Sequence, residues 1–225
     1  MRINRFGFAA AALVVSVVLS DVVQAQTPPT TPPVTPPAGG GRAGGGGGGG
    51  GGGRGGGRGA MRVMSLTSSA FTDGGMIPMK HAQAGHDVSP PLSWTGAPDS
   101  TRSFVLIVHD PDAAIGDGTD DMLHWMVWNI PGTATSLSEG LPQGSQAPDN
   151  IRQLSGTGPY YRGPAAPSTG PAHHYVFELY ALDAPINVTA AGQQTAPTRA
   201  AIMQAMQTHI RGKGVLVGLY KRPAP

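Results

Sequence analysis

Apolar residues gather in four runs between residues 103 and 220, and clusters of Gly, Pro, Asp and Ser separate one run from the next. The runs occupy residues 103–110, 122–130, 173–182 and 214–220. Short apolar segments bounded by turn-forming residues are typical of β-strands buried in a sheet or sandwich. The pattern therefore predicts a mainly β domain.

One segment, residues 197–211, has the period of an α-helix instead. Ile202, Met203, Met206 and Ile210 recur there at the spacing of one helical face. A proline stands near the start of the segment and a glycine directly follows it, as at many helix ends. We expect one amphipathic helix with these four side chains packed on a sheet.

The start of the chain has the composition of a targeting segment. Residues 1–25 combine two arginines, an apolar stretch shorter than the ~20 residues of a membrane span, and small residues leading to Ala25. This order is typical of a secretory signal peptide, and an uncleaved membrane anchor is the alternative. We therefore expect a periplasmic or secreted protein without a membrane span once the signal peptide is removed.

Residues 26–60 are rich first in Thr and Pro and then in Gly and Arg. Residues 39–59 alone hold 17 of the 35 glycines, and the whole segment has almost no apolar side chain to bury. Such a segment cannot offset the conformational entropy that ordering would cost, so we expect a disordered linker. Residues 61–225 remain as one domain of ordinary size.

The charge of the chain is distributed unevenly along its length. The whole chain has a net charge of +2, but five of its 15 basic residues and only one of its 13 acidic residues precede residue 61. The domain therefore has ten basic and twelve acidic residues, which argues against a specific nucleic-acid partner. The chain has no cysteine, so packing must hold the core without disulfides.

Ionisable and hydroxyl groups stand near the ends of three predicted strands. Because side chains alternate across a strand, we expect Asp110 on the face of the apolar residues before it and His124 on the face of Met126. His173 and Tyr175 share one face of the next strand. If these groups converge, they form a pocket with an apolar floor and a polar mouth, as in many ligand sites.

Six short motifs together resemble the successive signatures of the phosphatidylethanolamine-binding protein family, and more closely its bacterial Raf-kinase-inhibitor-like branch. The motifs are SPPLSW (89–94), DPD (110–112), HWMVWNIPG (124–132), YRGPAAP (161–167), HHYVFELYALD (173–183) and GLYKR (218–222). The resemblance covers residues 65–222. It implies a β-sandwich of two antiparallel sheets with peripheral helices and a small anion pocket at one end.

The same resemblance assigns ligand-binding residues motif by motif. They are Asp110, His124, Gly163, Pro164, His173 and Tyr175. We expect the first strand to end in a turn at Pro111, whose ring fixes the backbone φ angle, and Asp112 to bond loop amides. Two positions depart from the family pattern: Ala114 stands where proline is usual, and Asp87 where asparagine is common.

The residues of this pocket suit a phosphate or a similar small oxyanion. A charged histidine donates from both ring nitrogens, the Tyr175 hydroxyl is a further donor, and amides of a glycine loop can approach a ligand closely. A carboxylate repels an anion. We therefore expect Asp110 to pair with His124 or His173, or with an ammonium group of the ligand.

Three classes of function follow from these observations. The first is a binding module for a small phosphoanion or a phospholipid head group; family analogy adds inhibition of a kinase or protease. The second is a hydrolase of low activity or a metal-binding enzyme that uses the Asp and His cluster, although the sequence has no HExxH, GxSxG or Walker A motif. The third is a surface-interaction protein that acts through residues 26–60. We favour the binding module, without catalytic residues, metal or cofactor.

Overall fold

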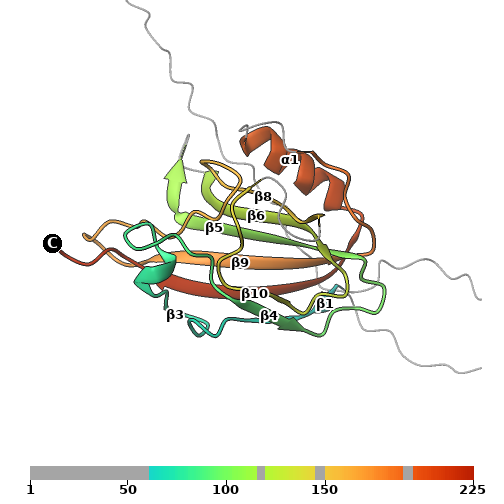
Figure 1. Ribbon diagram of the computed structural model, residues 1–225, viewed down its shortest axis with the longest axis horizontal. Helices are drawn as coiled ribbons and strands as arrows, with labels where there is room; N and C mark the ends of the chain where they lie inside the picture. Colours follow the sequence, from blue (N-terminus) through green and yellow to red (C-terminus); the bar gives the residue numbers. More distant parts are fainter. Residues whose placement is uncertain (1–60, 116–119, 145–149, 190–194) are drawn as a thin grey trace, which may run out of the picture. The chain divides into compact units, whose positions relative to one another are not determined.

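Two β-sheets of unequal size and the helix α1 (Thr195–Met206) form the framework of the described chain (Figure 1). The structure is a computed structural model that describes residues 61–115, 120–144, 150–189 and 195–225. The expected signal peptide and linker lie outside these residues. Within them, no helix is both long enough and apolar enough to cross a membrane.

The large sheet has seven strands in the order β1-β10-β9-β5-β6-β8, with β3 also paired to β10. These strands are β1 (Arg62–Val63), β3 (Gly75–Met76), β5 (Ser103–Ile115), β6 (Asp120–Pro131), β8 (Arg152–Leu154), β9 (His173–Leu182) and β10 (Ile210–Tyr220). The small sheet has the order β2-β4-β7, with β2 (Ser65–Thr67), β4 (Leu92–Thr95) and β7 (Ser136–Leu137). A 3-10 turn, η1 (Met79–His81), lies between β3 and β4 in the sequence.

The four apolar runs of the sequence form the four long strands of the large sheet, so the predicted mainly β fold is confirmed. β6, β5, β9 and β10 are neighbours and pair antiparallel. The two-residue strands β1 and β3 pair with β10 in the parallel sense. These two strands are too short to show a period of their own in the sequence.

The middle of the large sheet, at β5 and β6, is buried on both faces. Phe104, Leu106 and Val108 of β5 belong to the core between the two sheets, whereas the alternate residues Val105 and Ile107 belong to the core under α1. Figure 1 accordingly shows α1 on one side of the large sheet and β4 on the other. β5 and β6 therefore consist of nearly continuous apolar residues because each face has a covering layer, whereas every second residue of β10 is only partly buried or exposed.

The predicted C-terminal helix is present but shorter than expected. Ile202 and Met206 are buried against the sheet, while Met203 is 39% exposed because the next position lies about 100° further round the helix. The helix ends at Met206, whose carbonyl accepts a hydrogen bond from the His209 amide. Ile210 is not in the helix, contrary to the prediction; it opens β10 and pairs with Leu182.

The prediction that the first strand ends at the Asp-Pro-Asp motif is also wrong. β5 continues to Ile115, and its register with β6 shifts between Asp110 and Ile115. Such an irregularity bends a strand and changes the direction of its side chains without ending the pairing. The motif therefore marks a distortion within a hairpin strand rather than its last turn.

Candidate functional site

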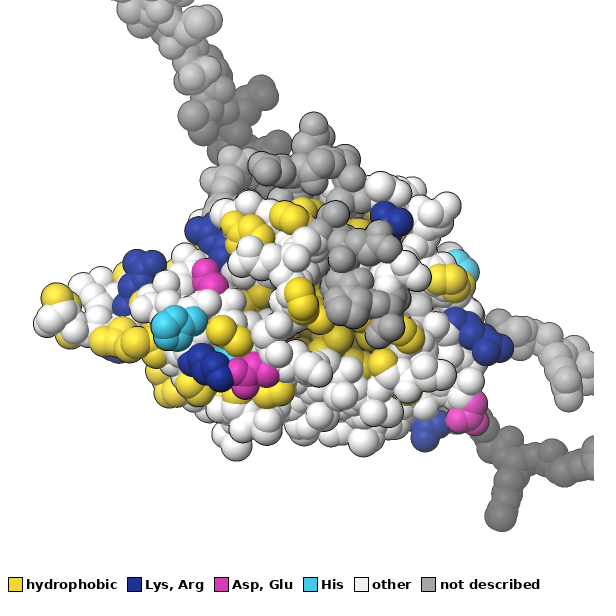
Figure 2. All heavy atoms as spheres, viewed as in Figure 1, with side chains coloured by type: hydrophobic (Ala, Val, Ile, Leu, Met, Phe, Trp, Pro, Cys, Tyr) yellow, Lys and Arg dark blue, Asp and Glu magenta, His cyan; other side chains and the backbone are white. Residues whose placement is uncertain are grey.

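A cavity of about 180 Å³ lies where β5, β6 and β9 meet the loop that precedes β9. Asp110, His124, His173 and Tyr175 all line it, so the structure brings these four predicted residues together. Figure 2 shows histidine, basic and acidic side chains close together at the end of the molecule where the C-terminus lies in Figure 1. Drug-sized ligands occupy pockets of ~300–1,000 Å³, so this cavity suits a smaller group.

Asp110 is a buried carboxylate whose oxygens are satisfied by hydrogen bonds. Its Oδ1 accepts the backbone N–H groups of Asp112 at 2.9 Å and Ala113 at 3.0 Å. Its Oδ2 accepts the Nδ1–H of His173 at 2.9 Å. The exposed Pro111 fixes the backbone between the two acidic residues. This arrangement offsets the desolvation of the carboxylate and orients the His173 ring.

Asp112 does not bond loop amides as expected. Its Oδ2 accepts both the backbone N–H of His174, at 2.7 Å, and the Nδ1–H of that residue's ring, at 2.8 Å. The backbone hydrogen bond is the largest cause of the lowered pKa of Asp112. The two aspartates thus join β5 to the first two residues of β9, one inside the cavity and one at the surface. In the sequence, the adjacent residues His173 and His174 are the signal from which this second Asp–His pair could have been predicted.

His124 reaches the cavity because of a β-bulge in β6. Val108 pairs with Trp125 and His109 with Leu123, so His124 is the extra residue between two ladder pairs. It does not share a face with Met126, as strict alternation predicted. Its ring lies edge-on to the Tyr175 ring, with 5.0 Å between centroids and an interplanar angle of 81°.

The His124 imidazole favours its neutral form. Its Nδ1–H donates to the carbonyl oxygens of Arg162, at 2.9 Å, and Gly163, at 3.1 Å. Burial is the largest influence on the ring, and it lowers the pKa of His124 below the ordinary value of 6.5. With the proton on Nδ1, the Nε2 atom of the neutral ring is a hydrogen-bond acceptor. His124 therefore favours a donor group on the ligand, in contrast to the charged donor expected from the sequence.

The Tyr175 hydroxyl holds the loop that closes the cavity. It accepts the backbone N–H groups of Ala165 and Ala166, each at 3.1 Å. Burial is the main reason that the pKa of Tyr175 rises to about 12, and the nearby Asp110 carboxylate adds to the shift. The hydroxyl therefore stays protonated at physiological pH. Both loop amides are already engaged, so they do not serve as the anion donors that the sequence suggested.

Gly163 and Pro164 are buried in the same loop, and their polar atoms bond to the protein. The Gly163 N–H donates to Asp87 Oδ1 at 2.9 Å, and the Gln83 side chain donates to the Gly163 carbonyl at 2.8 Å. A Cβ on Gly163 would lie 2.2 Å from the His81 carbonyl oxygen, so only glycine permits this approach. Neither Gly163 nor Pro164 lines the cavity; they hold in place the loop whose residues Ala165 and Ala166 do.

Three residues that the sequence did not assign to the site belong to its surroundings. Arg162 and Gln83 line the cavity, and Asp87 anchors its loop. Arg162 lies inside one of the quoted motifs, and Asp87 was visible as a departure from the family pattern. Gln83 carried no signal because it lies in an irregular segment without a period. Among the described residues, no group of three or more His, Cys, Asp or Glu could hold a metal ion.

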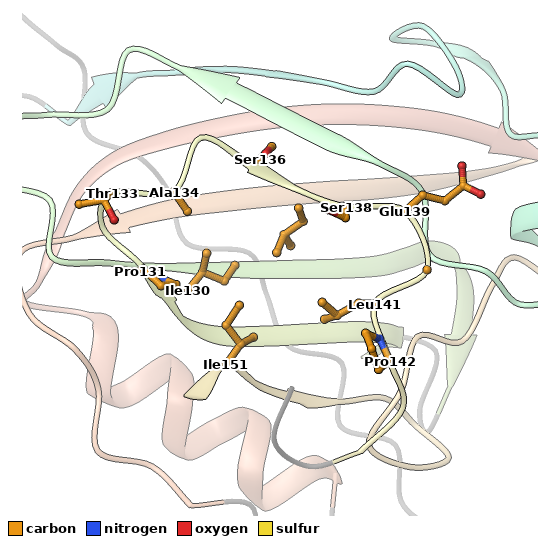
Figure 3. A pocket seen from close by; sticks show the side chains of 12 residues that line it. Ile130, Pro131, Thr133, Ala134, Ser136, Ser138, Glu139, Leu141, Pro142 and Ile151 are labelled. Carbon is orange, nitrogen blue, oxygen red and sulfur yellow. The ribbon is translucent and has the colours of Figure 1, made fainter. Parts of the chain in front are cut away.

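A second cavity, of about 520 Å³, lies between the end of β6, strand β7 and the loop after it (Figure 3). In Figure 3 the side chains of Ile130, Leu141 and Ile151 point toward its interior, and the Glu139 carboxylate points away. Glu139 forms an ion pair with Lys80. This cavity is larger, but the buried ionisable groups converge on the smaller one, which is therefore the better candidate for specific binding.

Comparison with known proteins assigns the chain to a family. The family model for phosphatidylethanolamine-binding protein matches residues 67–221. The chain belongs to the phosphatidylethanolamine-binding protein family. A UPF0098 protein of Methanothermobacter thermautotrophicus is 37% identical over 161 residues, which cover 71% of this chain and 99% of that protein. A UPF0098 protein of Pyrococcus horikoshii is 38% identical over 164 residues, covering 71% of this chain and 78% of that protein.

Solved structures of other members of the phosphatidylethanolamine-binding protein family have the same fold. A homologue from Chlamydia trachomatis has a TM-score of 0.58 and 31% identity, and the match covers 72% of this chain and 99% of that one. The Escherichia coli protein YbcL has a TM-score of 0.59 and 24% identity, with 71% and 98% covered. The family assignment supports ligand binding as the general function of this fold.

Proposed function

We propose that this protein binds a small phosphoryl anion in the cavity formed by Asp110, His124, His173 and Tyr175. The phosphoryl group is common to free phosphomonoesters and phospholipid head groups. The observation that carries the proposal is the convergence of four buried or half-buried polar side chains from three strands on one small cavity. Separate burial of these groups would be costly, whereas a shared site gives each of them a partner.

The hydrogen bonds leave one nitrogen of each cavity histidine for the ligand. His173 directs Nδ1–H to Asp110, so its Nε2 donates to a phosphoryl oxygen when the ring is protonated. The neutral His124 ring offers Nε2 as an acceptor for a P–OH or an ammonium hydrogen. A partly protonated phosphoryl group with an adjacent amine, as in phosphoethanolamine, supplies both kinds of partner.

The protein would carry out this binding outside the cytoplasm. The order of charged, apolar and small residues in 1–25 supports export by a signal peptide, and the Pro- and Gly-rich residues 26–60 would then remain as an N-terminal extension of the domain. Within the cavity, none of the four polar side chains is serine, threonine or cysteine. A binding role therefore accounts for the site without a covalent step.

Calorimetric titration of the 225-residue protein with phosphoethanolamine tests the proposal. We expect saturable binding that is lost in His173→Ala. The matched control is His209→Ala. His209 also bonds an aspartate, at 2.7 Å, but that aspartate, Asp183, directly follows the far end of β9. Thermal unfolding of each variant shows whether the fold persists. Absence of binding by the wild-type protein, or equal binding by folded His173→Ala, would contradict the proposal.

A further inference from the structure

Arg162 is the basic residue of the cavity, and its backbone is held firmly in place. Its N–H donates to the His124 carbonyl at 3.1 Å, and its carbonyl accepts the His124 Nδ1–H at 2.9 Å. The next residue, Gly163, is held by Asp87 and Gln83. The Cα of Arg162 therefore has a fixed position beside the bulge that carries His124.

Among the residues that the structure describes, none is an acidic partner of the Arg162 side chain. In the described chain, several other basic side chains form ion pairs. These pairs are Lys80 with Glu139, Arg199 with Asp121, Arg211 with Asp183, and Lys213 with Glu178. Across the same described ranges, the structure shows no hydrogen bond or ion pair from the Arg162 guanidinium, although its charge acts on the His124 ring. Its charge is thus available to a ligand.

The charges of the other cavity residues do not by themselves attract an anion. Asp110 is paired with His173, so that pair contributes no net positive charge even when His173 is protonated. The buried His124 favours its neutral form, and Tyr175 stays protonated and neutral. A guanidinium remains charged at every physiological pH. Arg162 therefore decides whether the cavity as a whole is positive.

We infer that Arg162 is the specificity-determining residue of this cavity and binds the phosphoryl group of the ligand through its guanidinium. The inference rests on the proposed function. A guanidinium presents two parallel N–H donors that match two oxygens of a phosphoryl group, whereas an ammonium acts as a point charge. The cavity thus selects ligands with an anionic phosphoryl end, and neutral analogues of the same size bind weakly.

The test compares three variants of the 225-residue protein by calorimetric titration with phosphoethanolamine and with a short-chain phosphatidylethanolamine below its micelle concentration. Arg162→Gln removes the charge. Arg162→Lys keeps the charge but removes the two parallel N–H donors of the guanidinium. Arg102→Gln is the matched control, because it makes the same change in net charge at an exposed position before the opposite end of β5. The two ligands distinguish a free phosphomonoester from a lipid phosphodiester as the source of the phosphoryl group.

We expect Arg162→Gln to weaken phosphoethanolamine binding by about 10- to 100-fold, the effect of one charged hydrogen-bonding group. Arg162→Lys should fall between this variant and the wild type, and Arg102→Gln should match the wild type. If Arg162 had only a structural role, Arg162→Gln would lower the melting temperature, and Arg162→Lys would not restore part of the binding. Wild-type affinity in folded Arg162→Gln overturns the inference and leaves the proposed function intact. Absence of wild-type binding to both ligands overturns both.

Discussion

The Tyr175→Phe variant removes one oxygen atom and leaves the aromatic ring in the core. In the native protein this hydroxyl accepts the N–H groups of Ala165 and Ala166, each at 3.1 Å, and the tyrosine is only 1% exposed. After the substitution both amides lose their acceptor. An unsatisfied buried group costs about 1–3 kcal/mol, and Ala165 is only half-buried, so we expect a loss of about 2–4 kcal/mol in the free energy of unfolding.

Tyr220→Phe is a matched control in the same core. Tyr220 is 3% exposed, and its hydroxyl is buried without a hydrogen-bond partner among the described residues. Removing a buried hydroxyl that has no partner removes a desolvation cost, so Tyr220→Phe should leave the stability unchanged or raise it by up to about 1 kcal/mol. The two variants have identical chemistry and opposite expected effects.

Urea denaturation of wild type and both variants measures these differences, and a thermal scan supports them. For a domain of this size about 1 kcal/mol corresponds to ~2–4 °C, so Tyr175→Phe should lower the melting temperature by about 4–16 °C. An equal or smaller loss of stability in Tyr175→Phe than in Tyr220→Phe would contradict this prediction. It would mean that the loop over the cavity does not depend on this hydroxyl.

Two further predictions concern His124 and Gly163. The pKa of His124 is lower in the native protein than in the unfolded chain, where it is about 6.5. At pH values between these two, the unfolded state binds more protons than the native state. The free energy of unfolding should therefore fall as the pH drops below about 6.5. An NMR titration of the His124 ring checks this, and a midpoint at or above 6.5 would contradict it. Gly163→Ala should cost at least ~2 kcal/mol, because the new Cβ meets the His81 carbonyl at 2.2 Å. Gly156→Ala, whose Cβ would have 3.3 Å to its nearest atom, should cost less in the same urea denaturation assay.

The sequence predicted a mainly β domain because its apolar runs are short and are bounded by turn-forming residues. It failed at the end of the helix for a related reason. Ile210 continues the helical spacing of Met206, but it is the first residue of β10, and apolar spacing cannot distinguish a buried helix residue from a buried strand residue. Strands of two residues, such as β1 and β3, have no period to detect.

Residue types alone predicted part of the candidate site. The part that depends on the register between neighbouring strands could not be predicted from the sequence. Asp110 and His173 form the ion pair that their residue types favour, and predicting that pair needed no detail of the sheet. His124 reaches the cavity through a bulge, which only the register with β5 reveals. Arg162 and Gln83 lie in irregular segments, where no periodic pattern indicates the direction of a side chain.

We expect the phosphoryl group to bind in the smaller cavity rather than in the larger apolar one. A crystal structure of the protein with phosphoethanolamine at a concentration that saturates binding in solution tests this expectation most directly. Electron density for the phosphoryl group should lie beside His173 and Arg162, with a donor group within hydrogen-bonding distance of His124 Nε2. Density in the cavity lined by Ile130, Leu141 and Ile151, with none beside His173, would contradict it.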